Sequence, residues 1–291
     1  MDNSENQSPL KKYRRQPKLF IDLPSKGKFY EEGKVLDSDQ IVQIPVFGMN
    51  AMDEILFKTP DALFSGRATA EVIHSCIPTV VNPWELVGYD IDYVLIAMRI
   101  ATYGDKMPVS SHCPKCSSLT ESQVSLMRVL EGFENYPVDF SFKLKELTFK
   151  IKPLTYKQTT EYSIENYTHE RELFQISKIE DDDARDKAQQ AVYKKQQDLN
   201  LRLATAYIDS IYNDESEERD INVIRSFIKT NDVEFYETLK NKIYELTHAW
   251  SLPKFDISCA NEECNHEYKT KITVDYSSFF GASSLISRTL I

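Results

Sequence analysis

The sequence predicts an α+β fold, with a helical N-terminal region, small strand hairpins and a long helical insertion. Three observations indicate this. Apolar residues recur at the helical period over most of 50–103, apolar and polar residues alternate over 140–151, and the helical period returns over 156–250. Of the 291 residues, 41% are hydrophobic and 11% aromatic. The chain can therefore build a sizeable core, which excludes a wholly disordered protein.

The N-terminus is polar and basic. Residues 11–18 (KKYRRQPK) hold five cations. We expect residues 1–18 to form a disordered tail, or alternatively an arm that orders on an acidic partner. The candidate contacts in it are Lys11, Lys12, Arg14 and Arg15. This polar start is neither a secretory signal nor a membrane anchor, and no apolar run in the chain is long enough to span a bilayer.

The region that follows mixes a short strand with several helices. A strand is expected at 41–47, where Pro45 favours a sheet edge. Asn50 is placed to cap a helix at 51–58, and Pro60 to open a short helix that ends at Gly66.

Two further helices are expected before residue 104. The first, at 67–77, carries one face formed by Ala70, Ile73, His74 and Ile77, so we expect His74 to be a core histidine. In the second, at 91–103, apolar residues nearly encircle the helix, so it should be buried on most sides with Asp90 as its cap. Trp84 is expected to anchor the core.

Beyond residue 139 the pattern changes twice. Residues 140–144 and 147–151 predict a hairpin around a two-residue Lys145-Glu146 turn. A long helical region then covers 156–250. Its segment 161–220 holds sixteen acidic and eight basic residues, and thus most of the net charge of −10. Those carboxylates belong either to a solvated helical face or to a docking surface for a basic partner.

Four of the five cysteines form two knuckles. They are Cys113 and Cys116 in CPKC, and Cys259 and Cys264 in CANEEC. Such spacers let one tight turn present two sulfurs to a single ion, and four thiolates complete the tetrahedral shell that zinc prefers. Each knuckle lies between short strand signals. We therefore expect a split four-cysteine zinc ribbon holding one structural zinc ion, although four thiolates also suit iron.

Other uses of the cysteines have less support. Disulfides need an oxidising compartment, to which nothing in the sequence directs the chain, and a CxxC redox pair lacks a thioredoxin-like pattern around it. His266 is an alternative ligand in place of Cys264. A closed thiolate shell leaves no position for an activated water, so the metal should not be catalytic. Cys76 lies on an apolar helix face and is expected to be buried.

Signatures of catalysis are missing from the sequence. It holds no GxxxxGK[ST], GxGxxG, HExxH or GxSxG motif, and its five histidines show no spacing that pairs them with a nucleophile. We therefore predict that the protein is not an enzyme and has no catalytic residues.

Several stretches resemble a known family. LPSKG at 23–27, MDEILFKTPDAL at 52–63 and IATYG at 100–104, followed by CPKC, are similar to the baseplate proteins of T4-like contractile-tailed bacteriophages. The resemblance spans about 19–130 and is weaker through the C-terminal half of the ribbon. Composition, periodicity and the resemblance together predict four regions: a tail at 1–18, a baseplate-family region with the first knuckle at 19–155, an acidic helical region at 156–250, and the second knuckle with a C-terminal tail at 251–291. The resemblance leaves the N-terminal tail and the helical region unassigned.

The resemblance implies a component of the baseplate hub, or a factor in its assembly. Such a protein would be made in the host cytoplasm and, if it stays, would reside in the virion tail baseplate. Its implied partners are other hub, tail-tube or tape-measure proteins, with no membrane and no nucleic acid. Phe279 and Phe280 in FFGASSL are either packed in the core or part of a peptide that docks a partner.

A second hypothesis comes from the ribbon itself. Zinc ribbons often serve nucleic-acid-binding or transcription accessory proteins, and KKYRRQPK offers cations for phosphates. The charge near the knuckles disfavours this reading. The sequence around the knuckles holds fewer positive than negative side chains: three lysines (Lys115, Lys269 and Lys271) against four glutamates (Glu121, Glu262, Glu263 and Glu267).

Overall fold

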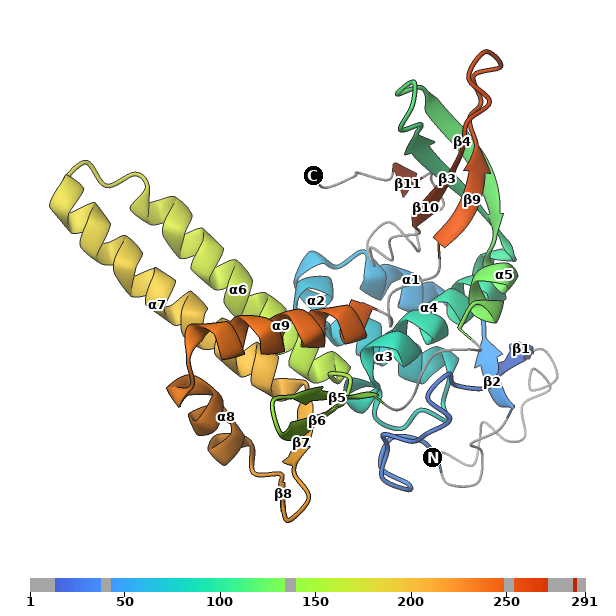
Figure 1. The fold of residues 1–291 in the computed structure, drawn as a ribbon. Helices are drawn as coiled ribbons and strands as arrows, with labels where there is room; N and C mark the ends of the chain where they lie inside the picture. Colours follow the sequence, from blue (N-terminus) through green and yellow to red (C-terminus); the bar gives the residue numbers. More distant parts are fainter. Residues whose placement is uncertain (1–13, 38–42, 134–139, 249–253, 272–284, 287–291) are drawn as a thin grey trace.

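The computed structural model describes residues 14–37, 43–133, 140–248, 254–271 and 285–286. It confirms the α+β class, with helices and small, mostly antiparallel sheets. A central body of short helices carries two projections, a long two-helix arm on one side and a pair of strand hairpins on another (Figure 1). None of the described helices is both long and apolar enough to cross a membrane.

The chain enters the body through a two-stranded antiparallel sheet of β1 (Pro17–Ile21) and β2 (Ile44–Phe47). Pro45 in β2 has no N–H to donate, and a two-stranded sheet leaves it at an edge, as predicted. The start of β1 lies inside the stretch expected to form the disordered tail, 1–18. Composition placed that boundary too late because a basic run gives no sign of a strand.

Helices form most of the body. They are α1 (Ala51–Phe57), α2 (Pro60–Phe64), α3 (Arg67–Cys76), α4 (Gly88–Tyr103) and α5 (Leu126–Glu131), with a 3-10 turn at Pro83–Glu85. Asn50 caps α1 as predicted. Its side chain accepts from the backbone N–H groups of Met52 and Asp53, while the Asp53 carboxylate accepts from the N–H of Asn50.

Two side-chain predictions in this region were wrong. His74 is exposed rather than in the core, and its Nδ1 lies 2.9 Å from the carbonyl oxygen of Val80. Asp90 does not cap α4, because the helix begins two residues earlier, at Gly88, whose N–H donates to the carbonyl of Leu154. The Asp90 carboxylate is instead fully buried.

A second sheet joins the body to the later part of the chain. Its strands are β5 (Phe140–Leu144), β6 (Leu147–Ile151), β7 (Ile208–Tyr212) and β8 (Glu217–Glu218), in that order and all antiparallel. The hairpin around Lys145-Glu146 is confirmed. Residues 156–250 were expected to be helical, but β7 and β8 interrupt them. Ile208 fits the helical period of the preceding residues, which hid the change to a strand.

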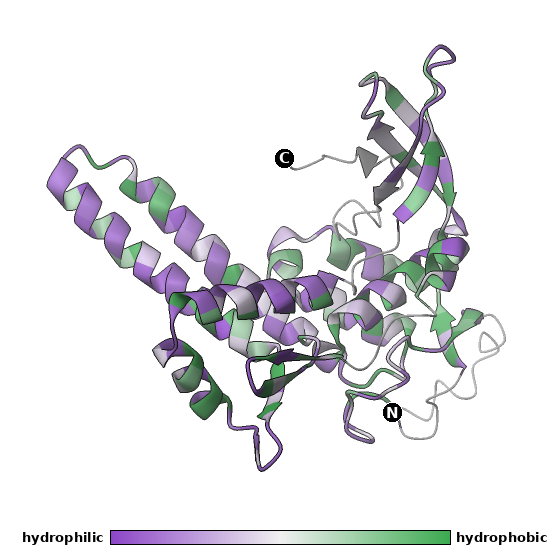
Figure 2. Ribbon diagram, in the orientation of Figure 1, coloured by the Kyte–Doolittle hydropathy of each residue, from purple (hydrophilic) through white to green (hydrophobic). Residues whose placement is uncertain are grey.

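The arm consists of α6 (Tyr156–Ile176) and α7 (Asp182–Ala206), packed along each other. Figure 2 shows that its outer half is mostly hydrophilic. Arg202 on α7 pairs with Glu165 on α6, and Lys195 with Glu172. After the sheet follow α8 (Ile221–Thr230) and α9 (Val233–His248), and α9 crosses the base of the arm (Figure 1).

One hydrophobic core runs through these parts, from Ile21 in β1 to Ile243 in α9. Helix α4 lies at its centre, and ten of its sixteen residues are buried, as its encircling apolar pattern predicted. Trp84 is half-buried and stacks on Tyr156 at a centroid distance of 5.3 Å, which fastens the base of the arm to the body.

Candidate metal centre

The first knuckle is the turn of a hairpin. Strands β3 (Lys106–His112) and β4 (Leu119–Ser125) pair in antiparallel register, and Cys113–Cys116 connect them. The Cys113 N–H donates to the carbonyl of Ser118, and the Ser117 N–H donates back to the carbonyl of Cys113. Ser117 takes a positive φ of 59°, which closes the turn. The two thiols are thereby presented on the same side of the hairpin end.

The second knuckle is also the turn of a hairpin, and 142 residues lie between Cys116 and Cys259. It connects β9 (Lys254–Ser258) to β10 (Glu267–Lys271). The Cys259 N–H donates to the carbonyl of His266, and the Cys264 N–H to that of Asn261. The Asn261 N–H points at the Cys259 sulfur, at 3.4 Å. Such N–H···S contacts stabilise a thiolate.

The fold brings all four sulfurs together. Cys113 Sγ lies 3.9 Å from Cys264 Sγ, Cys116 Sγ lies 3.5 Å from Cys259 Sγ, and all four lie within 4.8 Å of one another. These separations far exceed a disulfide bond of about 2.05 Å. Four sulfurs each ~2.3 Å from a central zinc lie about 3.8 Å apart along the edges of the tetrahedron. The cluster therefore has the donor set and the dimensions of a four-thiolate metal site.

The hairpins also contact each other away from the sulfurs. Ser111 Oγ on β3 lies 2.7 Å from the Tyr268 hydroxyl on β10. The Ala260 N–H donates to Thr120 Oγ1 at 3.2 Å. Each of these contacts joins one hairpin to the other, so the two knuckles are aligned by packing as well as by the cysteines.

The thiols differ in acidity. Hydrogen bonds from Ser118 lower the pKa of Cys116 to about 6, whereas burial and the neighbouring sulfurs raise the pKa of Cys264 to about 11. One thiolate forms easily, and each further negative sulfur beside it is opposed by repulsion. A divalent cation at the centre removes that repulsion, and this is the physical reason why such a cluster fits a metal.

The histidines near the knuckles are not part of the cluster. His266 stacks near Tyr268, and His112 Nδ1 lies 3.2 Å from the carbonyl oxygen of Ser117. Cys264 is in the group, so His266 is not needed in its place. Across the described ranges, no second group of histidine, cysteine or acidic side chains is arranged to hold a metal ion.

The remaining predicted site residues separate into two groups. Lys11, Lys12, Phe279 and Phe280 lie outside the described residues. Arg14 is exposed, whereas Arg15 donates to the carbonyl of Gly48 at 2.8 Å and lies 3.5 Å from the Asp53 carboxylate. Arg15 is therefore engaged with the body of its own chain.

Cys76 is fully buried, as predicted. Burial and the nearby Asp53 carboxylate raise the pKa of its thiol to about 12, so it remains protonated.

Sequence reasoning missed a buried polar site. The Asp90 carboxylate accepts from the backbone N–H of Ser25 at 3.0 Å, from the Ser25 hydroxyl, and from the Tyr30 hydroxyl at 2.6 Å. Burial raises the pKa of Asp90 to about 6, although these hydrogen bonds oppose the shift. Ser25 belongs to LPSKG, so this motif has a structural role that the sequence did not reveal. An acidic residue at the start of a mostly apolar helix was the available signal.

Comparison with known proteins identifies the family. The profile described as T4 bacteriophage base plate protein matches residues 22–281, which is most of the chain. Comparisons with curated proteins and with solved structures gave no match. The matched range includes both knuckles and the helical region that the resemblance left unassigned. A structural family of this kind favours a non-enzymatic role among the other structural proteins of a phage tail. The chain thus belongs to the T4 bacteriophage base plate protein family.

Proposed function

We propose that this protein is a component of the baseplate hub, or a factor in hub assembly, that acts through protein–protein contacts. The family match over residues 22–281 is the observation that carries the proposal. Its proposed partners are other hub, tail-tube or tape-measure proteins. On this proposal the chain is made in the host cytoplasm and reaches the virion tail if it is a permanent subunit.

We also propose that one structural zinc ion holds the two hairpins together. The four-sulfur cluster supports this, because its spacing fits a tetrahedral thiolate shell. Cys113, Cys116, Cys259 and Cys264 would be the ligands. The bound ion would tie residue 116 to residue 259, so that its binding energy adds to the stability of the fold. With four protein ligands it has no open position for substrate, so its role is mechanical.

The acidic helical region at 156–250 is the proposed contact for a basic partner surface. Part of its acidity serves the helices themselves, since Asp181 caps α7 and Asp182 pairs with Arg185. Other features favour a partner. Three aromatic side chains of the arm are at least half exposed: Tyr167, Phe174 and Tyr193. Exposed aromatic rings are enriched in protein interfaces relative to the rest of a protein surface.

Quantitative mass spectrometry of purified tails and of free hub precursors from infected cells tests the proposal. A fixed, small copy number in finished tails is the result expected of a structural subunit. Presence on precursors and absence from finished tails is the result expected of an assembly factor. Absence from both overturns the proposed function.

A further inference from the structure

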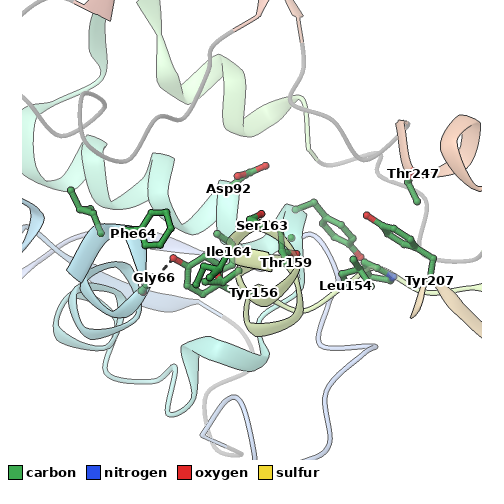
Figure 3. A pocket seen from close by; sticks show the side chains of 16 residues that line it. Phe64, Gly66, Asp92, Leu154, Tyr156, Thr159, Ser163, Ile164, Tyr207 and Thr247 are labelled. Atoms are coloured by element: carbon green, nitrogen blue, oxygen red, sulfur yellow. Dashed lines mark hydrogen bonds between the residues drawn. The ribbon is translucent and has the colours of Figure 1, made fainter. Parts of the chain in front are cut away.

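A cavity of about 490 Å³ lies where the arm joins the body. Its walls come from six segments of the fold: the end of α2, the start of α4, the link between β6 and α6, the first turns of α6, and the segments around Tyr207 and Thr247. Figure 3 shows Phe64 at one end and Tyr207 at the other, with Tyr156 and Leu154 between them. The volume falls within the range of about 300–1,000 Å³ typical of ligand pockets.

The walls are mostly apolar and aromatic, and one side chain contrasts with them. Asp92 of α4 lines the cavity (Figure 3), and among the described residues its carboxylate has no hydrogen-bond or ion-pair partner. The described lining holds no lysine, arginine or histidine. Burial raises the pKa of Asp92 to about 7. Asp92 is half-buried, and withdrawing a carboxylate even partly from water without a partner costs free energy, so its charge calls for a cation from outside this part of the chain.

We propose that the cavity receives the cationic side chain of a lysine or arginine from a partner baseplate protein, with Asp92 as its counter-ion. This inference rests on the proposed role in protein–protein contacts and adds a specific site to it. The side chain of Leu154 and the rings of Tyr89, Tyr156 and Tyr207 would pack on the methylene stem, and the rings would also attract the charge by cation–π contact. An anionic partner is disfavoured, because it would meet Asp92 with no positive charge to offset it.

The cavity is held in shape before any ligand arrives. The Gly88 N–H donates to the carbonyl of Leu154 at 3.0 Å, and the Tyr156 hydroxyl donates to the carbonyl of Gly66 at 3.3 Å. Gly66 has a φ of +75°, and a Cβ there would lie 3.0 Å from the Tyr156 hydroxyl oxygen. These bonds join the body to the arm across the cavity, so a side chain entering it needs little rearrangement.

Two small probes test the site on the full chain at pH 8, where Asp92 is mostly ionised. Nα-acetyl-lysine methylamide carries the positive charge on its side chain, and Nα-acetyl-norleucine methylamide keeps the apolar stem without that charge. With the isoleucine methyl groups labelled, NMR shifts at Ile91 and Ile164 report on the cavity, and those at Ile257 in β9, which does not line it, serve as the control. We expect saturating shifts at the two cavity residues with the lysine probe and at least tenfold weaker binding of the norleucine probe.

The Asp92→Asn variant separates charge recognition from apolar binding. It keeps the shape of the side chain and should bind the lysine probe at least tenfold more weakly, while the isoleucine shifts away from the cavity stay unchanged in the protein without a probe. Equal binding of the two probes, equal binding by the variant, or no saturating shifts at Ile91 and Ile164 each overturn the proposal.

A second measurement tests the partner. In infected cells we expect at least a tenfold loss of the Asp92→Asn chain from tails or hub precursors relative to wild type. Normal incorporation of a variant that fails to bind the probe overturns the docking role. If the wild-type chain is absent from both particles, the proposed baseplate function fails, while the probe titration still decides whether the cavity binds cations.

Discussion

Ser25 and Asp90 are joined by two hydrogen bonds, although 65 residues separate them in the chain. The backbone N–H and the hydroxyl of Ser25 both donate to the Asp90 carboxylate, and the Tyr30 hydroxyl is a third donor. Ser25 and Asp90 are fully buried. This contact fixes the LPSKG turn against the first turn of α4, and through α4 it fixes the turn to the centre of the core.

Replacing Asp90 by alanine should therefore destabilise the fold strongly. Asp90→Ala leaves one buried N–H and two hydroxyls without their acceptor, and we expect a loss of about 3 kcal/mol in the free energy of unfolding. Ser25→Ala removes one donor to Asp90 and the acceptor of the Gly27 N–H, and it should cost about 1–2 kcal/mol. Urea unfolding followed by circular dichroism measures both. An Asp90→Ala variant within about 0.5 kcal/mol of wild type would contradict the role given to this contact.

Asp92 lies two residues further along the same helix. Its replacement should stabilise the fold, whereas the replacement of Asp90 destabilises it. Burial raises the pKa of Asp92 from 3.8 to about 7. Between about pH 4 and pH 7 the unfolded chain has lost this proton while the native protein still holds it, so the contribution of Asp92 to stability falls as pH rises through that window. Above pH 7 both states are ionised and the contribution is constant.

The Asp92→Asn variant isolates this effect, because Asp90 is present in both proteins. We expect equal stability near pH 4 and a variant that is more stable than wild type by about 1–2 kcal/mol at pH 8, a value reduced from the full shift because the side chain is partly exposed. Urea titrations at several pH values measure the difference. A variant that is less stable than wild type at pH 8 would mean that the ionised carboxylate already has a partner within the chain.

The sequence predicted the elements whose signals are local. The Asn50 cap, the short helix opened by Pro60 and the hairpin turn at Lys145-Glu146 each depend on neighbouring residues, and the structure has all three. The cysteine knuckles were predictable for the same reason, since each pair is set by one turn.

The features that the sequence did not predict depend on contacts between distant segments of the chain. Ile208 forms part of β7 because β6 lies beside it, and Asp90 is buried because Ser25 and Tyr30 reach it. The cavity beside Asp92 is formed by six segments of the chain, and no single stretch of sequence carries a sign of it. Such features depend on tertiary pairing, which periodicity does not report.

Arg15 provides a test of whether the basic N-terminal stretch is part of the fold. Its guanidinium bonds to the carbonyl of Gly48 and approaches the buried Asp53 carboxylate, and it lies over the Phe47 ring. We expect Arg15→Ala to lower the free energy of unfolding by about 1 kcal/mol. Lys18→Ala is the matched control, because Lys18 is an exposed cation of β1, and it should change stability little. Equal values for the two variants would place Arg15 outside the folded unit.

The role of the cysteine cluster is tested by comparing zinc content and hydrogen exchange in wild type and in a cysteine variant. Purified protein should contain one zinc ion per chain, and the double variant Cys113→Ser/Cys259→Ser should contain none. Without metal, two ligand pairs no longer join the hairpins, so the amides of β3, β4, β9 and β10 should lose protection in hydrogen exchange. Those of α4, at the centre of the core, should lose much less.

Cys76→Ala is the control for this experiment, since Cys76 is buried in α3 outside the cluster and should not affect zinc content. A chelator added to wild type should reproduce the exchange pattern of the double variant, because both remove the same link between residues 116 and 259. A double variant that lacks zinc and yet keeps full protection in both hairpins would show that contacts such as that between Ser111 and Tyr268 suffice, and that the metal does not hold the ribbon closed.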